Sequence, residues 1–563
     1  MNIPDKLKID TWQDIEPYFK ELKNRKINSV AELENWIKNR SKLFAILDEE
    51  MAWRYIKMTC DTENKKLAEH YEFYVTQIQP NISKYADELN RKLADNGFFD
   101  KLPDYYSNLK RTVIRELELF REENVELYAK LGTLEQKYAQ ITGAMTVEFD
   151  AKELTMQQAA NYLKNPNREI REKTYRLIGD RRLKDSEELN NLLSEMVKLR
   201  HQIAVNAGFE NFRDYSHKAR ERFDYSVEDV LEFDEAIRKQ VVPVVEKITE
   251  HRKNKLGLDI LKPWDMDVDI SGKEALKPFK DAKDFLEKTI ECFTSVRPQY
   301  GEYLKLMGEK GFLDLESRKG KAPGGYNYPL MLSNIPFIFM NATSNIRDVE
   351  TLVHEGGHAI HAFKAKDIEL TEYKSTPPEI AELASMSMEL ISMEHWQVYF
   401  DNNDDLRRAK IHQLEGVLSV LPWVATVDKF QHWLYTNYQH DDLDRVMAWG
   451  KIYRDYSSKL IDYSGVQWHS LNMWQKQLHI FEVPFYYIEY AISQLGAIAI
   501  WKNYRQNPEE ALDKYEKALS LGYTTTLPKL YNAAGIKFDF SAEYIEELIS
   551  FVYDELLKLY NAE

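Results

Sequence analysis

Cysteine and long apolar runs are the features that this sequence has least of. Cys60 and Cys292 are the only cysteines among 563 residues, and their spacing fits neither a disulfide framework nor a zinc ribbon. No apolar run approaches the ~20 residues that a membrane-spanning helix needs. The segment from Met1 to Lys6 lacks the basic region and the apolar run of a secretory signal. We therefore expect a protein of the reducing cytoplasm, with no secretory leader and no membrane span.

Positive charge is also in deficit. Lys and Arg together number 76 against 92 Asp and Glu, which gives a formal net charge of −16. This balance disfavours general binding to nucleic acid. Low-complexity linkers and repeats of solenoid period are missing as well. With 44% hydrophobic residues, a chain of this length is expected to fill two or more packed lobes.

Helical patterns fill most of the chain. Charged, Leu-rich and Tyr-rich stretches such as 107–131 and 166–206 predict long amphipathic helices. Residues 335–340 are instead typical of a short strand, and Pro336 suits an edge strand or a strand start because it cannot donate to a ladder. An edge strand there could bind an extended peptide by strand addition, or a small sheet could merely support the helix that follows.

Three prolines divide the C-terminal helical region. We expect Pro377 to open one helix, Pro422 to interrupt another and Pro484 to precede a third. Together with the N-terminal pattern, this predicts a mainly α fold with a small β-sheet.

The most informative stretch is His354-Glu355-Gly356-Gly357-His358. On a helix, residues four apart lie on one face, so both imidazoles can reach a single metal ion. The carboxylate after the first histidine projects roughly 100° around the axis and can act on a water molecule. Each glycine costs about 1 kcal/mol relative to alanine in a helix, but lets another backbone or a substrate come close. The pattern predicts zinc-dependent peptide hydrolysis.

Flanking residues place this motif inside a helix. Asn345 can cap the helix, with Asp348 at the third helical position. Leu352, Val353 and Ile360 then recur at helical spacing. The geometry that two histidine ligands require is therefore expected to form.

A third protein ligand has to come from elsewhere, because catalytic zinc usually takes three and leaves one position open. His361 shares the face of the motif, but its Cα lies about 10.5 Å along the axis from that of the first histidine, so we expect a packing neighbour. Lys364 occupies the position of the third metzincin histidine. On the next predicted helix, Glu379, Glu382 and Glu389 form one stripe. Spacing alone does not choose among them, and one that is not a ligand could orient a ligand imidazole.

The segments 354–361 and 382–389 resemble the paired zinc-site helices of the M3 peptidases, the thimet oligopeptidase and oligoendopeptidase F family. The resemblance is closest to the bacterial oligoendopeptidase F branch and extends over most of the chain, including 200–212 and 485–490. In that family the third ligand is the first Glu of a Glu-x-x-Ser-x-x-x-Glu pattern, which falls on Glu382.

The resemblance implies one zinc ion per chain, held by His354, His358 and Glu382. Such an ion lowers the pKa of water and polarises a carbonyl group. Glu355 would take the proton of the attacking water and deliver it to the leaving amine.

A further segment resembles the histidine and tyrosine region with which this family lines its active site. It contains His479, Tyr486, Tyr487 and Tyr490. We expect His479 and Tyr490, together with Tyr486, to stabilise the oxyanion that forms when water attacks. Tyr486 and Tyr490 would share a helix face as residues i and i+4, and Tyr487 and Tyr490 are the competing pair.

The family also implies a two-lobed helical fold around a deep substrate channel, with the small sheet next to the zinc helix. We expect an N-terminal helical lobe over 1–195 and a catalytic region over 196–563, with the lobes interleaved. The implied activity is endopeptidase cleavage of short, unstructured oligopeptides, without nucleic-acid or membrane partners. An aminopeptidase is the rival enzyme, although its Gly-x-Met-Glu-Asn element is missing, and a helical scaffold with a vestigial motif is the rival outside enzymes.

Overall fold

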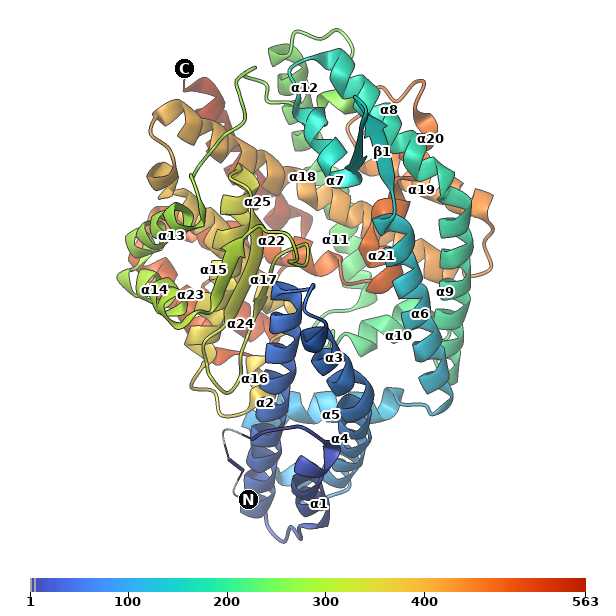
Figure 1. Cartoon of the computed structure of the whole chain (residues 1–563), viewed down its shortest axis with the longest axis vertical. Coiled ribbons are helices and arrows are strands. Elements are labelled where there is room, and N and C mark those ends of the chain that lie inside the picture. The colour runs from blue at the N-terminus through green and yellow to red at the C-terminus, as the bar shows by residue number, and fades with distance from the viewer. Residues whose placement is uncertain (1–2, 5–6, 563) are drawn as a thin grey trace. The chain divides into compact units, whose positions relative to one another are not determined.

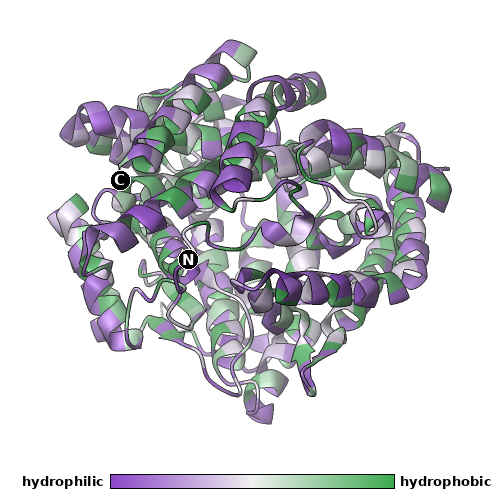
Figure 2. Ribbon diagram, turned by 90° about the horizontal axis from the view of Figure 1, so that it is seen from above, coloured by the Kyte–Doolittle hydropathy of each residue, from purple (hydrophilic) through white to green (hydrophobic). Residues whose placement is uncertain are grey.

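The computed structural model describes residues 3–4 and 7–562. Residues 1, 2, 5 and 6 of the segment inspected for a secretory signal lie outside the described residues. The expected mainly α fold is confirmed, since helices dominate and only two small sheets accompany them in the described part of the chain (Figure 1). Purple and green alternate along most helices in Figure 2, the pattern of helices that bury one stripe.

Contacts between Cα atoms divide the chain into two compact units. Unit 1 comprises Met1–Glu118, Leu276–Lys410 and Ser493–Phe538, and unit 2 comprises Leu119–Ala275, Ile411–Ile492 and Asp539–Glu563. The units interleave along the sequence. Residue 195, the approximate boundary expected from the sequence, lies within α9 (Ser186–Asn206), which shares one apolar core with the preceding helix α6 (Glu123–Gly143).

Unit 1 is built from helices around a three-stranded sheet. Its helices are α1 (Glu16–Asn24), α2 (Val30–Cys60), α3 (Lys65–Phe73), α4 (Gln79–Ala94), α5 (Ser107–Leu119), α13 (Ala282–Val296), α14 (Pro298–Lys310), α15 (Ile346–Ala365), α16 (Thr371–Lys374), α17 (Pro378–Met393), α23 (Pro508–Leu521) and α24 (Leu527–Ala533). Its strands are β3 (Leu313–Glu316), β4 (Tyr326–Tyr328) and β5 (Phe337–Ala342).

Unit 2 is also helical, with one two-stranded sheet. Its elements are α6 (Glu123–Gly143), β1 (Thr146–Phe149), β2 (Lys152–Thr155), α7 (Met156–Ala160), α8 (Arg168–Lys184), α9 (Ser186–Asn206), α10 (Phe212–Ala219), α11 (Val227–Gln240), α12 (Val242–Lys255), α19 (Asp442–Tyr456), α20 (Gln467–Leu471), α21 (Leu478–Glu482) and α25 (Ala542–Asn561). The unit boundaries at 410 and 492 fall within α18 (Asn403–Thr436) and α22 (Ile488–Gln506).

The sheet of unit 1 has the order β3-β5-β4, with β5 parallel to β3 and antiparallel to β4. Phe337 and Phe339 of β5 pack with Ala52 and Ile56 of α2, and α15 contacts β4 and β5. The small sheet expected beside the motif helix is therefore present. β5 is the central strand, however, and β4 forms an edge. Pro336 directly precedes β5, so its missing N–H costs no ladder bond.

One expected helix break is also wrong. Pro422 lies inside α18, which runs unbroken from Asn403 to Thr436. Its neighbours Leu421, Val424 and Ala425 are fully buried. We attribute the continuity of the helix to this packing, which offsets the one hydrogen bond that a proline removes.

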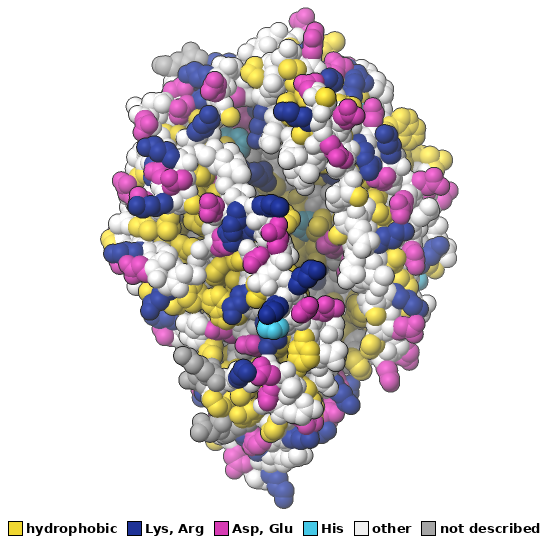
Figure 3. Space-filling view, viewed as in Figure 1, with side chains coloured by type: hydrophobic (Ala, Val, Ile, Leu, Met, Phe, Trp, Pro, Cys, Tyr) yellow, Lys and Arg dark blue, Asp and Glu magenta, His cyan; other side chains and the backbone are white. Residues whose placement is uncertain are grey.

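The surface carries charges of both signs. On the face shown in Figure 3, basic and acidic side chains are interspersed. None of the helices in the described part of the chain combines the length and the apolar character that a membrane crossing requires.

Candidate metal centre and histidine–tyrosine cluster

Helix α15 begins as its sequence predicts. Asn345 caps it by accepting a hydrogen bond from the backbone of Asp348 (3.2 Å), and the Asp348 carboxylate accepts one from the backbone of Asn345 (3.0 Å). This capping box fixes the start of the helix three turns before the end of the motif. The motif therefore lies in regular α-helix, with the rings of His354 and His358 4.9 Å apart.

The two motif glycines allow α15 to be packed closely on two sides. A Cβ atom at Gly357 would lie 2.6 Å from Cα of Ser385 and 2.7 Å from the carbonyl oxygen of Ala384, both in α17. At Gly356 it would lie 2.5 Å from the ring of Phe293. Only glycine fits at these contacts. The expected close approach of another backbone is thus found at Gly357, where α17 crosses (Figure 1).

This contact brings a glutamate of α17 to both motif histidines. Oε2 of Glu382 lies 3.3 Å from Nε2 of His354 and 3.9 Å from Nε2 of His358. One ligand atom from each of the three residues lies within 4.8 Å of the other two, so the group could hold a metal ion. Tetrahedral zinc with ligands at 2.0–2.2 Å separates its ligand atoms by roughly 3.4 Å. Two imidazoles and a carboxylate also form a donor set that zinc accepts.

The other two glutamates of the stripe occupy different places. Oε1 of Glu389 lies 2.6 Å from Nδ1 of His354, on the ring nitrogen opposite the one that faces Glu382. The backbone carbonyl of Glu379 accepts hydrogen bonds from Ser493 and Tyr531. The Glu389 carboxylate is therefore placed to orient the His354 ring.

The electrostatics of the group follow from burial and from these contacts. Burial raises the pKa of Glu355 to about 7. Burial alone would also raise the pKa of Glu382, but the hydrogen bond from His354 and the charges of both histidines lower it to about 2. Burial lowers the pKa of His358 to about 4. At His354 burial acts in the same direction, but Glu382 and Glu389 outweigh it and hold the pKa well above its ordinary value.

A hydrogen bond connects the edge strand β4 to the motif. The side-chain amide of Asn327 in β4 donates to the backbone carbonyl of Glu355 (3.0 Å). Sequence patterns do not indicate this contact, because Asn327 lies in a Gly-rich and Pro-rich stretch 28 residues before Glu355.

The predicted histidine and tyrosines gather in unit 2. The ring of His479 lies 6.0 Å from Tyr486, 4.6 Å from Tyr487 and 5.9 Å from Tyr490. We call these four residues the histidine–tyrosine cluster. Tyr486 does not share a helix with Tyr490, because α22 begins only at Ile488. The rings of Tyr486 and Tyr490 nevertheless lie 5.3 Å apart, and those of Tyr487 and Tyr490 5.5 Å apart.

Two arginines, the buried Arg222 and the half-buried Arg220, hold the turn before α22. Phe485 has a positive φ of 65°, a conformation that non-glycine residues adopt at a cost of about 1–3 kcal/mol. Its carbonyl accepts from Arg222, which also pairs with Glu489 (2.9 Å), and the carbonyl of Pro484 accepts from Arg220 (2.9 Å). These contacts fix the turn and with it the position of Tyr486.

Neighbouring side chains fix the tautomer of His479. Burial and the charge of Arg220 lower its pKa to about 4, so the ring is neutral at pH 7. The amide of Gln477 donates to Nδ1 (2.7 Å), and Trp423 donates to the amide oxygen (3.2 Å), which sets the orientation of the amide. Because Nδ1 accepts, Nε2 carries the proton. His479 can therefore donate a hydrogen bond from Nε2.

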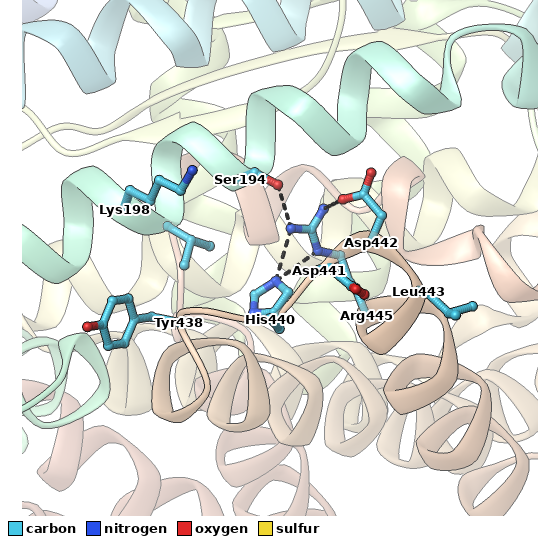
Figure 4. A pocket seen from close by; sticks show the side chains of 9 residues that line it. Ser194, Lys198, Tyr438, His440, Asp441, Asp442, Leu443 and Arg445 are labelled. Carbon is cyan, nitrogen blue, oxygen red and sulfur yellow. Dashed lines mark hydrogen bonds and ion pairs between the residues drawn. The ribbon is translucent and has the colours of Figure 1, made fainter.

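A cavity of about 410 Å³ in unit 2 surrounds a network of hydrogen bonds within the protein (Figure 4). The buried guanidinium of Arg445 donates to Ser194 (2.7 Å), to Asp442 (3.3 Å) and to Nε2 of His440 (3.0 Å). Burial lowers the pKa of Arg445 to about 10. The N–H groups of Arg445 thus form hydrogen bonds within the protein, and these bonds connect α9 to the start of α19.

Known proteins resemble this chain over most of its length. The sequence profile of Peptidase family M3 matches residues 161–549, and that of the Peptidase M3 N-terminal domain matches residues 6–119. Oligopeptidase PepF of Bacillus subtilis (strain 168) is 24% identical over 71% of this chain, and the match spans only 60% of that protein. An oligoendopeptidase F homolog of Lactococcus lactis subsp. lactis (strain IL1403) is 21% identical over 88% of this chain and 82% of its own length. The solved structure of PZ peptidase A with inhibitor 2 superposes with a TM-score of 0.89, at 26% identity and 98% coverage of both chains.

Proposed function

Because the chain belongs to peptidase family M3, in its oligoendopeptidase F branch, we propose that this peptidase is a zinc-dependent endopeptidase that cuts internal bonds of short, unstructured oligopeptides. The observation that carries the proposal is the convergence of His354, His358 and Glu382 beside the buried carboxyl group of Glu355. Peptides are the partners that this function requires.

The ligand atoms suit a cation at this point. The Glu382 carboxylate is ionised at neutral pH, and His358 is neutral, so its nitrogen offers a lone pair. A metal ion would replace the proton that Glu382 and Glu389 favour on His354. Glu389 then keeps the proton on Nδ1 of His354 and directs Nε2 to the ion. Zinc bound here, one ion per chain, would polarise the scissile carbonyl and lower the pKa of water.

Glu355 is the group that moves protons. Its pKa of about 7 lies near the working pH, so the carboxylate can accept a proton from the attacking water and return it to the leaving amine. Burial supplies this shift, and it would be lost if the side chain were hydrated.

We assign stabilisation of the oxyanion to His479 and Tyr490, with Tyr486 as a further donor. The neutral ring of His479 with its proton on Nε2 supports this role, because such a donor costs no reorganisation during the reaction. The two cysteines are free thiols, which supports the expected cytoplasmic setting.

A blocked peptide library tests the proposal. N-acetylated, C-amidated peptides of increasing length would be incubated with the zinc-loaded protein, and the cut bonds would be mapped by mass spectrometry. We expect internal cuts, loss of cleavage with a chelator and recovery on adding zinc. Cleavage of only the unblocked peptides would indicate an aminopeptidase. Full activity of a metal-free preparation would contradict the zinc mechanism, and absence of both zinc and cleavage would favour a scaffold.

A further inference from the structure

A cavity of about 310 Å³ lies in unit 1 directly beside the candidate metal centre. Its wall includes His358 and His361 of α15 and Asn327, the residue of β4 that is bonded to Glu355. Its volume is at the low end of ligand pockets, which span roughly 300–1,000 Å³, so it suits one side chain rather than a length of peptide. A substrate whose scissile bond lies at Glu355 would have a neighbouring residue within reach of this cavity.

The cavity combines apolar walls with a single cation. Its apolar part is contributed by Leu330, Met331, Pro336, Ala362 and Ala365. Lys374, at the end of α16, also lines it, and the Nζ of Lys374 donates to the side-chain oxygen of Asn334 (2.7 Å).

The ammonium group of Lys374 forms no ion pair with any residue that the structure describes. Among the described residues, no carboxylate oxygen lies within 4.0 Å of it, whereas Lys38 and Lys364 each pair with a glutamate. An ammonium group has three donors, and Asn334 takes one of them. Partial burial lowers the pKa of Lys374, and the charge of Asp367, which acts in the opposite direction, offsets this effect only in part.

A second polar group of the cavity is also without a partner. His361 is 6% exposed, and its Nε2 atom is buried without a hydrogen-bond partner in the described part of the chain. Buried polar atoms are normally hydrogen-bonded, so an orphaned one beside a cavity indicates a place for a ligand.

We propose that this cavity, the Lys374 pocket, is a substrate subsite that binds a carboxylate next to the scissile bond. Lys374 pairs with the carboxylate, and the apolar walls hold the methylene groups that carry it. The carboxylate can belong to a Glu or Asp side chain or to the C-terminus of the peptide, which are chemically alike at the ammonium group. This inference names the substrate class of the proposed peptidase and rests on that function.

Matched peptides measure the effect. Glu, Gln and Ala would be placed in turn at the two positions on each side of the cut bond, each peptide with a free or an amidated C-terminus. At one position we expect kcat/KM for Glu to exceed that for Gln by roughly 10- to 100-fold, the value of a charged hydrogen bond. Lys374→Met should abolish this ratio, and Lys374→Glu should invert it, so that kcat/KM for Gln exceeds that for Glu. If amidation of the C-terminus lowers kcat/KM and the change from Glu to Gln does not, the terminal carboxylate is the ligand.

Controls separate this inference from the proposed function. Lys366→Met changes an exposed lysine near the end of α15 and should keep the wild-type ratio. Direct binding of the same peptides to Glu355→Gln, followed by fluorescence anisotropy, needs no turnover, and there the Glu peptide should bind more tightly only when Lys374 is present. The subsite would be overturned if the Glu-to-Gln ratio of kcat/KM is the same in wild type and Lys374→Met, even if cleavage is observed. It would also be overturned if Lys374→Met lowers kcat/KM equally for all peptides. Binding discrimination without any cleavage would instead overturn the proposed function and retain the subsite.

Discussion

At the scale of single residues, the surroundings of a side chain decide its chemistry more than its type does. Glu355 and Glu382 are both buried, yet the pKa is about 7 for the first and about 2 for the second. The difference arises because Glu382 lies 3.3 and 3.9 Å from two imidazoles. Glu355 is therefore suited to proton transfer and Glu382 to binding a cation, a division that spacing along the sequence does not reveal.

Removing the charge of Glu389 should weaken metal binding. Glu389 is the carboxylate that holds Nδ1 of His354, and the loss of such a partner typically costs 10- to 100-fold in metal affinity. We expect Glu389→Gln to raise the Kd for zinc by roughly that factor, and excess zinc to restore much of the activity. Competition with a chelating dye measures the Kd, with Glu369→Gln, an exposed glutamate, as control. An unchanged Kd would contradict the orienting role.

Truncation of the His479 side chain should lower kcat. Removal of one donor to a developing oxyanion costs about 100- to 1,000-fold in kcat. We expect His479→Ala to lose kcat by that factor, with a small change in KM and an unchanged zinc content. Steady-state kinetics on a blocked peptide give both constants, and the exposed His70→Ala serves as control. A change confined to KM would assign His479 to substrate binding only.

At the scale of helices and strands, the features that neighbouring residues determine could be predicted from the sequence. The features that depend on tertiary packing could not. The capping box of α15 is formed by residues three apart, so the sequence contains all that determines it. The choice of Glu382 within its stripe depends on where α17 crosses α15, and here only the family resemblance, not spacing, pointed to the residue that lies between the histidines. Pro422 does not break α18, because the packing of its neighbours overrides the tendency of proline to end a helix. Tyr486 lies outside α22, because the positive φ of Phe485 places a turn before the helix.

The contact between α15 and α17 predicts the effect of one added methyl group. Gly357→Ala would place a Cβ 2.6 Å from the backbone of α17, and overpacking of this kind costs about 1–3 kcal/mol. We expect a lower Tm and weaker zinc binding, since Glu382 would move away from the histidines. Gly416→Ala in α18, where no atom lies within 4 Å of the added Cβ, should instead be neutral or stabilise by up to about 1 kcal/mol. Equal behaviour of the two variants in thermal unfolding would contradict the close packing.

At the scale of the whole molecule, each unit has its own apolar core and contains one of the two groups of predicted site residues. Unit 1 contains the candidate metal centre, and unit 2 contains the histidine–tyrosine cluster. Unit 2 also buries Asp234 of α11 completely, near Asp428 of α18, whose carboxylate lies 3.0 Å from His432. Burial, and then the charge of Asp428, hold the pKa of Asp234 well above its ordinary value.

This buried acid predicts how stability depends on pH. The folded protein retains a proton on Asp234 that the unfolded chain releases near pH 4, so this contribution to stability is complete below pH 4 and declines as pH rises. Asp234→Asn removes the titration. We expect the variant to be more stable than wild type at pH 8 and the difference to shrink toward pH 5, by up to about 1.4 kcal/mol per pH unit. Thermal unfolding at several pH values measures it, and a difference independent of pH would contradict the raised pKa.

The central claim is that a zinc site and a proton-transferring glutamate together hydrolyse peptides, and Glu355→Gln tests it most directly. Glutamine keeps the size of the side chain but cannot accept the proton of water. Zinc content and cleavage of a blocked peptide would be measured on the same preparations of wild type and variant. We expect equal zinc, close to one ion per chain, and loss of nearly all turnover in the variant. Unchanged turnover in a zinc-loaded Glu355→Gln protein would contradict the mechanism.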